Sequence, residues 1–354
     1  MAWLLFPLSM WYAVGVAFRN LLFGIGLLKE RSHAVTTIGV GNLCTGGAGK
    51  TPMVEYLLRL YKDRYRTAML SRGYRRHTRG FVLASDESTV ADIGDEPLQV
   101  CRKFNDVTVS VCENRNAGVE KLLSLQEPPQ IVVLDDVYQH RYIKPTVNIL
   151  LTEYKRPYFK DMILPFGNLR EFRFGSRRAD IVVVTKTPAD VSPVERYAFR
   201  QSLGLMPYQS VFFTRIAYMS PVPIGDVEVP NIADVDKVLL VSGIANPEPL
   251  IAELSRKATV SHMRFPDHHE FTRDDMESIS QTFAALPSEN KMVVTTEKDA
   301  VRISSCRYYE VVSALPMCYI PVEMEFLDNG GEDFANGLNK VVKENIYCLN
   351  KRIS

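Results

Sequence analysis

Short apolar runs alternate with longer amphipathic or polar segments along most of this chain. In its first half such runs occupy residues 35–40, 67–71, 108–112, 131–134, 147–151 and 181–185. Runs of this length, separated by segments with helical spacing, predict the buried strands of a parallel sheet with helices on both faces. A second alternating series between residues 237 and 322, whose last predicted strand is 317–322, predicts a smaller α/β unit. One-sided apolar spacing over 332–351 predicts a C-terminal helix.

The alternation of apolar runs and amphipathic segments changes near residues 191–229, where prolines and glycines interrupt it. We therefore expect a large α/β domain at 31–205, a linker at 206–230, a smaller α/β domain at 231–325 and a terminal helix at 326–354. A length of 354 residues with 46% hydrophobic content is enough for two buried cores.

The first 30 residues form a separate segment, almost wholly apolar up to residue 28 and broken mainly by Arg19 and Asn20. The apolar run 3–18 would form about 24 Å of helix, which is shorter than the roughly 30 Å of hydrocarbon in a bilayer. We therefore expect a membrane-associating helix that lies in the interface, with Arg19 reaching the headgroups. A spanning helix and a helix packed on the protein are the alternatives, whereas the basic start and cleavage site of a secretory signal are missing.

The net charge and the cysteines indicate which binding partners and which cellular compartment to expect. The formal net charge is +1, which gives no reason to expect nucleic acid. The six cysteines show neither disulfide-like nor metal-like spacing, so we expect free thiols in a reducing compartment. Neither a repeat nor a low-complexity tail suggests an obligate protein partner.

A glycine-rich loop follows the first strand, at residues 44–51, and reads CTGGAGKT. Its first position is Cys44 where the phosphate-binding pattern has glycine, but the order of strand, loop and amphipathic helix is the one that this pattern requires. Backbone N–H groups of such a loop converge on phosphate oxygens, Lys50 would reach the β- and γ-phosphates, and the Thr51 hydroxyl would bind Mg²⁺. The loop predicts binding of a nucleoside triphosphate through Thr45, Gly46, Gly47, Ala48, Gly49, Lys50 and Thr51.

Two acidic pairs are candidates for metal binding and proton transfer. Asp135 and Asp136 end the strand 131–134, the place where a phosphate-loop protein holds Mg²⁺, and Gln139 and His140 follow toward the same crevice. Residues 94–97, which read GDEP, offer a carboxylate as base for a hydroxyl acceptor, although the same letters suit the cap of a helix.

Basic and histidine-containing segments complete the candidates. The segment 71–79 packs arginines around Tyr74 and could grip a phosphorylated, ring-bearing substrate, or could be a solvated loop. His268 and His269 stand beside two carboxylates, with a structural role as the commoner explanation. The stretch 295–299, TTEKD, is typical of a helix cap after a strand, and a place near the nucleotide or a hinge is the alternative.

These motifs together resemble the tetraacyldisaccharide 4'-kinase family, from the apolar N-terminus through the second domain. The resemblance implies transfer of the ATP γ-phosphate to the 4'-hydroxyl of an acylated glucosamine disaccharide 1-phosphate, a lipid A precursor, at the cytoplasmic face of the inner membrane of Gram-negative bacteria. It also implies that the phosphate loop binds ATP and that Asp95 is the catalytic base, assisted by His268 with His269 left open. By the same analogy, metal ligands would be Thr51, Glu96, Asp135 and Asp136, and substrate contacts would be Tyr74, Arg115, Gln139, His140 and Arg170. Val137 and Tyr138 depart from the family pattern before Gln139.

Two other functions would use the same phosphate-binding loop at residues 44–51. A membrane-associated GTPase switch would need a guanine-reading segment of the form [NT]-K-x-D after a late strand, but residues 185–188 read TKTP and fail at the last position. An anchored ATPase acting on a protein partner is the other alternative. Nucleotide preference and dependence on added glycolipid distinguish these from the kinase.

Overall fold

The computed structural model describes residues 6–353, which fold into two compact units. Unit 1 comprises residues 1–87, 100–216 and 324–354, and unit 2 comprises residues 88–99 and 217–323. The segment 88–99, which the sequence pattern assigned to the large domain, therefore belongs to unit 2. Unit 1 contains α1 (Phe6–Gly24), β1 (Thr36–Asn42), α2 (Lys50–Tyr61), β2 (Thr67–Ser71), β3 (Val82–Leu83), β4 (Thr108–Val111), α5 (Arg115–Leu123), β5 (Ile131–Leu134), β6 (Val147–Glu153), β7 (Ile181–Thr185), α6 (Pro193–Ser202) and α10 (Gly330–Ile353).

Three elements run across the boundaries of the two units, and the remainder belong to unit 2. The shared elements are α4 (Asp95–Lys103), β8 (Ser210–Tyr218) and β14 (Val322–Phe326). Unit 2 contains α3 (Val90–Ile93), β9 (Val222–Pro223), β10 (Lys237–Ser242), α7 (Glu248–Leu254), β11 (Thr259–Arg264), α8 (Arg273–Ala285), β12 (Lys291–Thr296), α9 (Glu297–Ser304) and β13 (Met317–Ile320).

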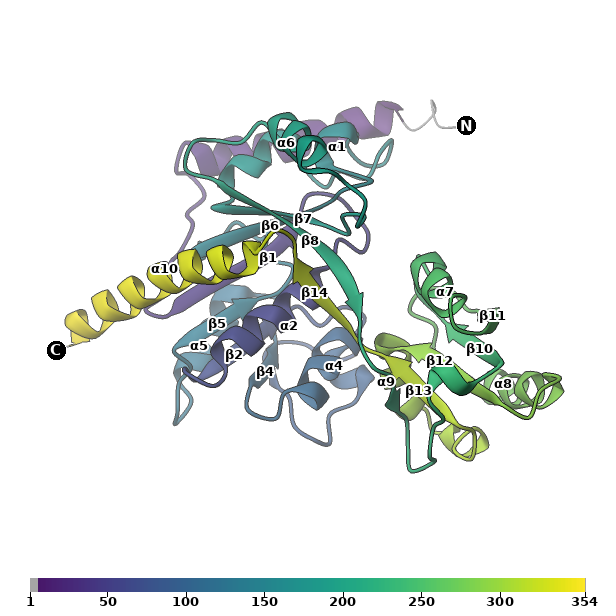
Figure 1. Ribbon diagram of the computed structural model, residues 1–354. Coiled ribbons are helices and arrows are strands. Elements are labelled where there is room, and N and C mark those ends of the chain that lie inside the picture. The colour runs from purple at the N-terminus through teal and green to yellow at the C-terminus, as the bar shows by residue number, and fades with distance from the viewer. Residues whose placement is uncertain (1–5, 354) are drawn as a thin grey trace. The chain divides into compact units, whose positions relative to one another are not determined.

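The large sheet has nine strands in the order β14-β8-β7-β6-β1-β5-β2-β4-β3 (Figure 1). The pairs from β8 through β4 are parallel, and only β3 pairs antiparallel among the registers that the structure defines. The parallel α/β fold expected from the sequence is confirmed. Strand β1 lies between β5 and β6, so the loop that follows β1 has the carboxyl ends of both neighbours beside it.

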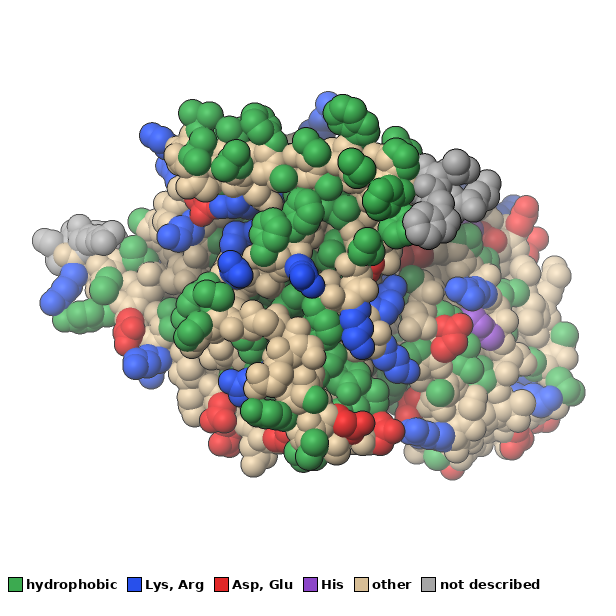
Figure 2. Space-filling view, turned by 90° about the horizontal axis from the view of Figure 1, so that it is seen from above, with side chains coloured by type: hydrophobic (Ala, Val, Ile, Leu, Met, Phe, Trp, Pro, Cys, Tyr) green, Lys and Arg blue, Asp and Glu red, His purple; other side chains and the backbone are tan. Residues whose placement is uncertain are grey.

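The N-terminal helix α1 lies against the loop 163–170 and the Tyr142 region of unit 1. Ser9 Oγ donates to the Ile163 carbonyl at 2.7 Å, and Phe23 packs edge-on against Tyr142. The other face of α1 is exposed and apolar, and Figure 2 shows hydrophobic side chains gathered on the side of the molecule that carries this helix. Within residues 6–353, no helix has both the length and the hydropathy needed to cross a membrane.

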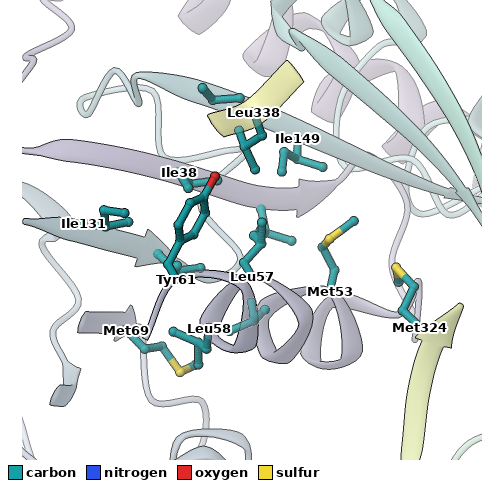
Figure 3. Close-up of a cluster of buried hydrophobic side chains, with 14 of the residues drawn as sticks. Ile38, Met53, Leu57, Leu58, Tyr61, Met69, Ile131, Ile149, Met324 and Leu338 are labelled. Carbon is teal, nitrogen blue, oxygen red and sulfur yellow. The ribbon is translucent and has the colours of Figure 1, made fainter. Parts of the chain in front are cut away.

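Apolar side chains cover both faces of the large sheet, because alternate strand residues point to opposite sides. Ile38, Met69 and Val133 pack with α2 and α10 on one face, where Leu57 and Tyr61 are fully buried (Figure 3). On the opposite face, alternate residues of β2 and β5 pack with α5, and those of β6 and β7 pack near α6. Truncating one such buried leucine to alanine costs about 2–5 kcal/mol in stability. This packing fixes α2 on the sheet, and α2 in turn fixes the position of the phosphate loop that precedes it.

Unit 2 has its own five-stranded sheet, in the order β11-β10-β12-β13-β9. Its four longer strands are parallel, and β9 pairs antiparallel with β13. The sequence predicted one strand at 317–322, which is wrong: Pro321 separates β13 from β14, since proline has no N–H for the ladder. Buried residues of α8 and α9 complete one face of this sheet.

Candidate functional site

The phosphate loop has the backbone that its glycines allow. Gly46 and Gly49 have φ angles of 106° and 82°, in the region where side-chain-bearing residues are strained. Gly49 is the N-cap of α2, so the first N–H groups of that helix point into the loop without partners inside the helix. Thr45 N–H donates to the Asn168 carbonyl at 2.8 Å, which ties the start of the loop to the segment before Arg170. This loop suits the binding of an anion.

Lys50, the first residue of α2, connects the loop with the end of β5. Its Nζ lies 3.3 Å from Asn42 Oδ1 and 3.6 Å from Asp136 Oδ1. Asn42 ends β1 and Asp136 follows β5, which are neighbouring parallel strands. The ammonium therefore lies between the loop and a strand-end carboxylate. Its contact with the β- and γ-phosphates stays a prediction.

The two carboxylates after β5 differ in their surroundings. Asp135 is buried and accepts a hydrogen bond from Ser71 Oγ at 3.0 Å, and burial raises its pKa. Burial alone would also raise the pKa of Asp136, but Lys50 and Arg170 outweigh it and lower that pKa. Carboxylate oxygens are the hard ligands that Mg²⁺ prefers, so the chemistry of these two side chains suits this ion.

Arg170 and Gln139 join the same group. Arg170 Nη1 lies 3.1 Å from both carboxylate oxygens of Asp136 and 3.3 Å from Gln139 Oε1. Gln139 Nε2 donates to the Asn42 carbonyl at 2.8 Å and to Glu171 Oε1 at 3.2 Å. Val137 and Tyr138, the departures from the family pattern, are buried and leave Gln139 beside the end of β1.

The other expected substrate residues have different surroundings. Arg115 is 2% exposed and donates to the backbone carbonyls of Cys112 and Asp135, at 2.8 and 2.9 Å, so here it fixes the end of β5 rather than facing solvent. The pKa of His140 is lowered to about 4 by burial, with Arg115 and Arg72 adding to the effect. Tyr74 is 57% exposed, with the Arg75 guanidinium over its ring.

Unit 2 holds the second group of predicted residues, around Asp95 at the start of α4. Asp95 is 3% exposed, and its Oδ2 accepts from His268 Nδ1 at 2.9 Å and from Arg302 Nε at 3.1 Å, with Arg302 Nη2 also donating. Burial would raise the pKa of Asp95, but the hydrogen bond from His268 and the charges of Lys298 and Arg302 hold it well below its ordinary value. Asp95 is therefore ionised at neutral pH.

Glu96 pairs with a cation from another element of the same unit. Lys298 Nζ donates to Glu96 Oε1 at 2.7 Å and lies 3.5 Å from His268 Nε2. Burial, together with the neighbouring Asp95, raises the pKa of Glu96 to about 7. Asp95, Glu96 and His268 lie close enough to share a metal ion, but Lys298 and Arg302 already supply positive charge there. Metal binding by Glu96 stays a prediction.

The structure separates the two adjacent histidines. His268 has a φ of 60° and turns its ring to Asp95. His269 instead lies 2.9 Å from Asp275, the acidic partner in the capping box of α8, and stacks on Phe265. Only His268 therefore joins the group around Asp95.

Sequence reasoning gave no individual role to Ser71 and Lys298, which lie within candidate segments, and it missed Arg302. The stretch TTEKD is the cap of α9, as expected, because Thr296 accepts from Asp299 N–H at 3.1 Å. The same short helix also carries Lys298 and Arg302, four residues apart on one face. Two cations at this spacing directly after a strand could have indicated, from the sequence, that a carboxylate lies beside them in the fold.

Comparison with known proteins gives one family. The model of the family described as tetraacyldisaccharide-1-P 4'-kinase matches residues 1–343. The chain belongs to the tetraacyldisaccharide 4'-kinase family. A relative of that name from Bacteroides thetaiotaomicron is 42% identical over 96% of this chain and 93% of its own length, and one from Flavobacterium johnsoniae is 42% identical over 97% and 98%.

A solved member of the same family has a similar fold. The crystal structure titled as the "apo" form of LpxK from Aquifex aeolicus in complex with ATP matches with a TM-score of 0.75 and 29% identity. The match covers 96% of this chain and 99% of that one. The resemblance to the tetraacyldisaccharide 4'-kinase family that the motifs indicated is thus confirmed over almost the whole chain.

Proposed function

We propose that this protein is an ATP-dependent kinase that phosphorylates the 4'-hydroxyl of a tetraacylated glucosamine disaccharide 1-phosphate, giving the bis-phosphorylated lipid A precursor. The observation that carries the proposal is Lys50, held between the phosphate loop and Asp136 in a chain of this family. Phosphoryl transfer needs this combination because charge develops on the transferred group and must be neutralised in place.

The residues of unit 1 would bind and polarise the nucleotide. Loop N–H groups and Lys50 would hold the phosphates, while Arg170 keeps Asp136 oriented through its two contacts at 3.1 Å. Mg²⁺ held by Thr51, Asp135 and Asp136 would supply further charge neutralisation on the phosphates. Ser71 and Arg115 hold the Asp135 side chain and carbonyl, so the ligand geometry is fixed before binding.

The residues of unit 2 would act on the acceptor hydroxyl. His268 donates through Nδ1 to Asp95 if its proton lies there, which leaves Nε2 with a lone pair. The Asp95–His268 pair would orient the 4'-hydroxyl and take its proton. Arg302 lowers the basicity of Asp95 but fixes the direction of its carboxylate, and in this reaction positioning contributes more than proton affinity.

The acylated substrate and helix α1 together favour a membrane-surface location. Trp11, Val14 and Phe18 on the outer side of α1 are 78%, 59% and 61% exposed, while Ser9 and Val16 face the protein. A helix attached on one side and apolar on the other suits binding in the plane of a lipid interface. We propose that α1 keeps the enzyme at the cytoplasmic face of the inner membrane, where ATP and the glycolipid meet.

The decisive experiment is transfer of label from [γ-³²P]ATP to the purified disaccharide 1-phosphate in detergent micelles. Lys50→Ala should lower turnover by at least about 10²-fold, and the control Lys62→Ala, at the far end of α2, should be near normal. Absence of transfer by the unaltered protein, or a preference for GTP, would refute the kinase assignment and favour a nucleotide-dependent switch. Near-normal turnover of Lys50→Ala would remove the role given to Lys50.

A further inference from the structure

Helix α1 lies across two loops of unit 1, and each loop carries a side chain of the group around Asp136. Gln139 belongs to the connection after β5, and Arg170 belongs to the connection between β6 and β7. The second half of α1 packs on the first connection through Phe23, whose ring centroid lies 5.1 Å from that of Tyr142. The first half of α1 contacts the second connection, so one helix joins both loops.

The contacts of the first half of α1 are hydrogen bonds to the backbone of the loop 161–170. Ser9 is 4% exposed, and its Oγ donates to the Ile163 carbonyl at 2.7 Å. The Tyr12 hydroxyl donates to the Arg170 carbonyl at 2.8 Å. These two side chains therefore hold the loop both near its start and at its end.

The loop 161–170 is closed by its own hydrogen bonds. The Asp161 carboxylate accepts from the N–H groups of Met162 and Asn168, at 2.8 and 3.0 Å. Leu169 N–H donates to the Met162 carbonyl at 2.8 Å. Gly167 lies so close to this carbonyl that a Cβ there would overlap it. Because its two arms are bonded to each other, a displacement of one arm also displaces the other.

The second arm of this loop pairs with the start of the phosphate loop. Thr45 N–H donates to the Asn168 carbonyl at 2.8 Å. Arg170 N–H donates to the Leu43 carbonyl, also at 2.8 Å. The position of the phosphate loop therefore depends on the loop 161–170 as well as on the packing of α2.

Arg170 is the residue at which these contacts converge. Its N–H donates to the Leu43 carbonyl and its own carbonyl accepts from the Tyr12 hydroxyl, so both peptide groups that flank its Cα are held. Its Nη1 lies 3.1 Å from both carboxylate oxygens of Asp136. The rotamers open to a side chain depend on its backbone, so the hydrogen bond from Tyr12 helps to direct the guanidinium to Asp136.

From these contacts we infer that Ser9 and Tyr12 of α1 are positioning residues for phosphoryl transfer, which act through the loop 161–170 on Arg170 and on the phosphate loop. Helix α1 then has a separate role on each face. Its apolar outer face binds the lipid interface, and its inner face fixes the geometry around Asp136. A misplacement of about 1 Å that originates far from the chemistry can lower the rate by about 10²-fold. This inference rests on the kinase activity and the membrane location proposed above.

The test separates the two faces of α1 in the full chain. Ser9→Ala combined with Tyr12→Phe removes the two hydrogen bonds and leaves the outer face unaltered. This variant should lower kcat for transfer to micellar glycolipid by about tenfold, while co-sedimentation with anionic lipid vesicles stays unchanged. The matched control makes the same two changes on the exposed side of α6, as Ser202→Ala with Tyr197→Phe, and should alter neither quantity.

A double-mutant cycle identifies the route of the effect. Arg170→Ala removes the residue through which Tyr12 acts, so adding Tyr12→Phe to it should lower kcat by less than about twofold further. Amide hydrogen exchange needs no substrate. Peptides that cover residues 41–50 and 161–172 should exchange faster in the variant with Ser9→Ala and Tyr12→Phe than in the unaltered protein.

An unchanged kcat in the variant with Ser9→Ala and Tyr12→Phe would overturn the inference, and so would effects of Tyr12→Phe and Arg170→Ala that multiply in full. A parallel loss of vesicle binding would also overturn it, because the two faces would then not be separate. If the unaltered protein transfers no phosphate, the kinase proposal fails, while hydrogen exchange over residues 161–172 still decides whether α1 holds this loop.

Discussion

Replacing Arg302 with methionine tests how the charged group of unit 2 is held together. Arg302 donates to Asp95 through Nε and Nη2, to Asp299 Oδ1 at 2.8 Å and to the Gly243 carbonyl at 3.2 Å. Asp95 is 3% exposed and Asp299 is fully buried. Arg302→Met keeps an unbranched stem but removes the guanidinium, which leaves two buried carboxylates without their shared cation.

The expected loss of stability follows from that burial. Removing one partner of a buried ion pair costs about 3–5 kcal/mol, because the remaining charge has neither water nor a partner. Gly243 N–H and the Thr296 hydroxyl still bind Asp299, and His268 still binds Asp95, so we expect the lower part of this range. At about 2–4 °C per kcal/mol, the unfolding temperature of unit 2 should fall by about 6–12 °C.

The measurement must report on unit 2. Both tryptophans, Trp3 and Trp11, precede residue 12 in the sequence, and unit 2 contains none, so tryptophan fluorescence does not report on unit 2. Calorimetry combined with amide hydrogen exchange of peptides from β12 and α9 would follow the affected region. Arg256→Met is the control, because Arg256 is 76% exposed and its pairing with Glu253 contributes less than about 1 kcal/mol.

The pH dependence gives an independent check. An Asp95 pKa held below its unfolded value contributes stability that is complete above about pH 4 and is lost as pH falls through the lower folded pKa. Without Arg302 this pKa rises, so acid unfolding should begin at a higher pH. The reasoning is refuted if Arg302→Met is as stable as Arg256→Met, or if its acid transition coincides with that of the unaltered protein.

Three further outcomes follow from the site and from α1. His268→Ala should lower turnover at least about 10²-fold, whereas His269→Ala, whose ring pairs with Asp275, should change turnover little; equal losses in the label-transfer assay would contradict this distinction. Chelation of Mg²⁺ should abolish transfer, and Asp135→Asn should raise the half-saturating Mg²⁺ concentration by about tenfold or more; an unchanged Mg²⁺ titration would exclude Asp135 as a ligand. Trp11→Asp combined with Phe18→Asp should reduce co-sedimentation with anionic lipid vesicles while transfer to micellar glycolipid persists, and undiminished sedimentation would exclude α1 as the anchor.

The family and the large sheet were predictable because their signals are local. The phosphate loop, the strand before it and the helix after it are contiguous, and the strands at 67–71, 131–134 and 181–185 have the predicted bounds. The strand at 317–322 was misjudged because apolar content was weighed above the missing N–H of Pro321. The segment 88–99 was assigned to the large domain because it stands between strands of that domain in the sequence. The sequence does not show which unit this segment contacts in the fold.

Residue composition and spacing thus determined the nucleotide loop, the fold class and the candidate carboxylates, since each depends on neighbours within a few positions along the chain. Tertiary structure alone decided that Asp95 belongs with His268 and Arg302, which lie 173 and 207 positions away, and that His269 belongs elsewhere. It also turned Arg115 inward to the carbonyl of Asp135, and brought Lys186 to the Gly47 carbonyl. Hydrogen-bond partners of buried charges depend on which chain segments fold against one another, and no local pattern encodes that choice.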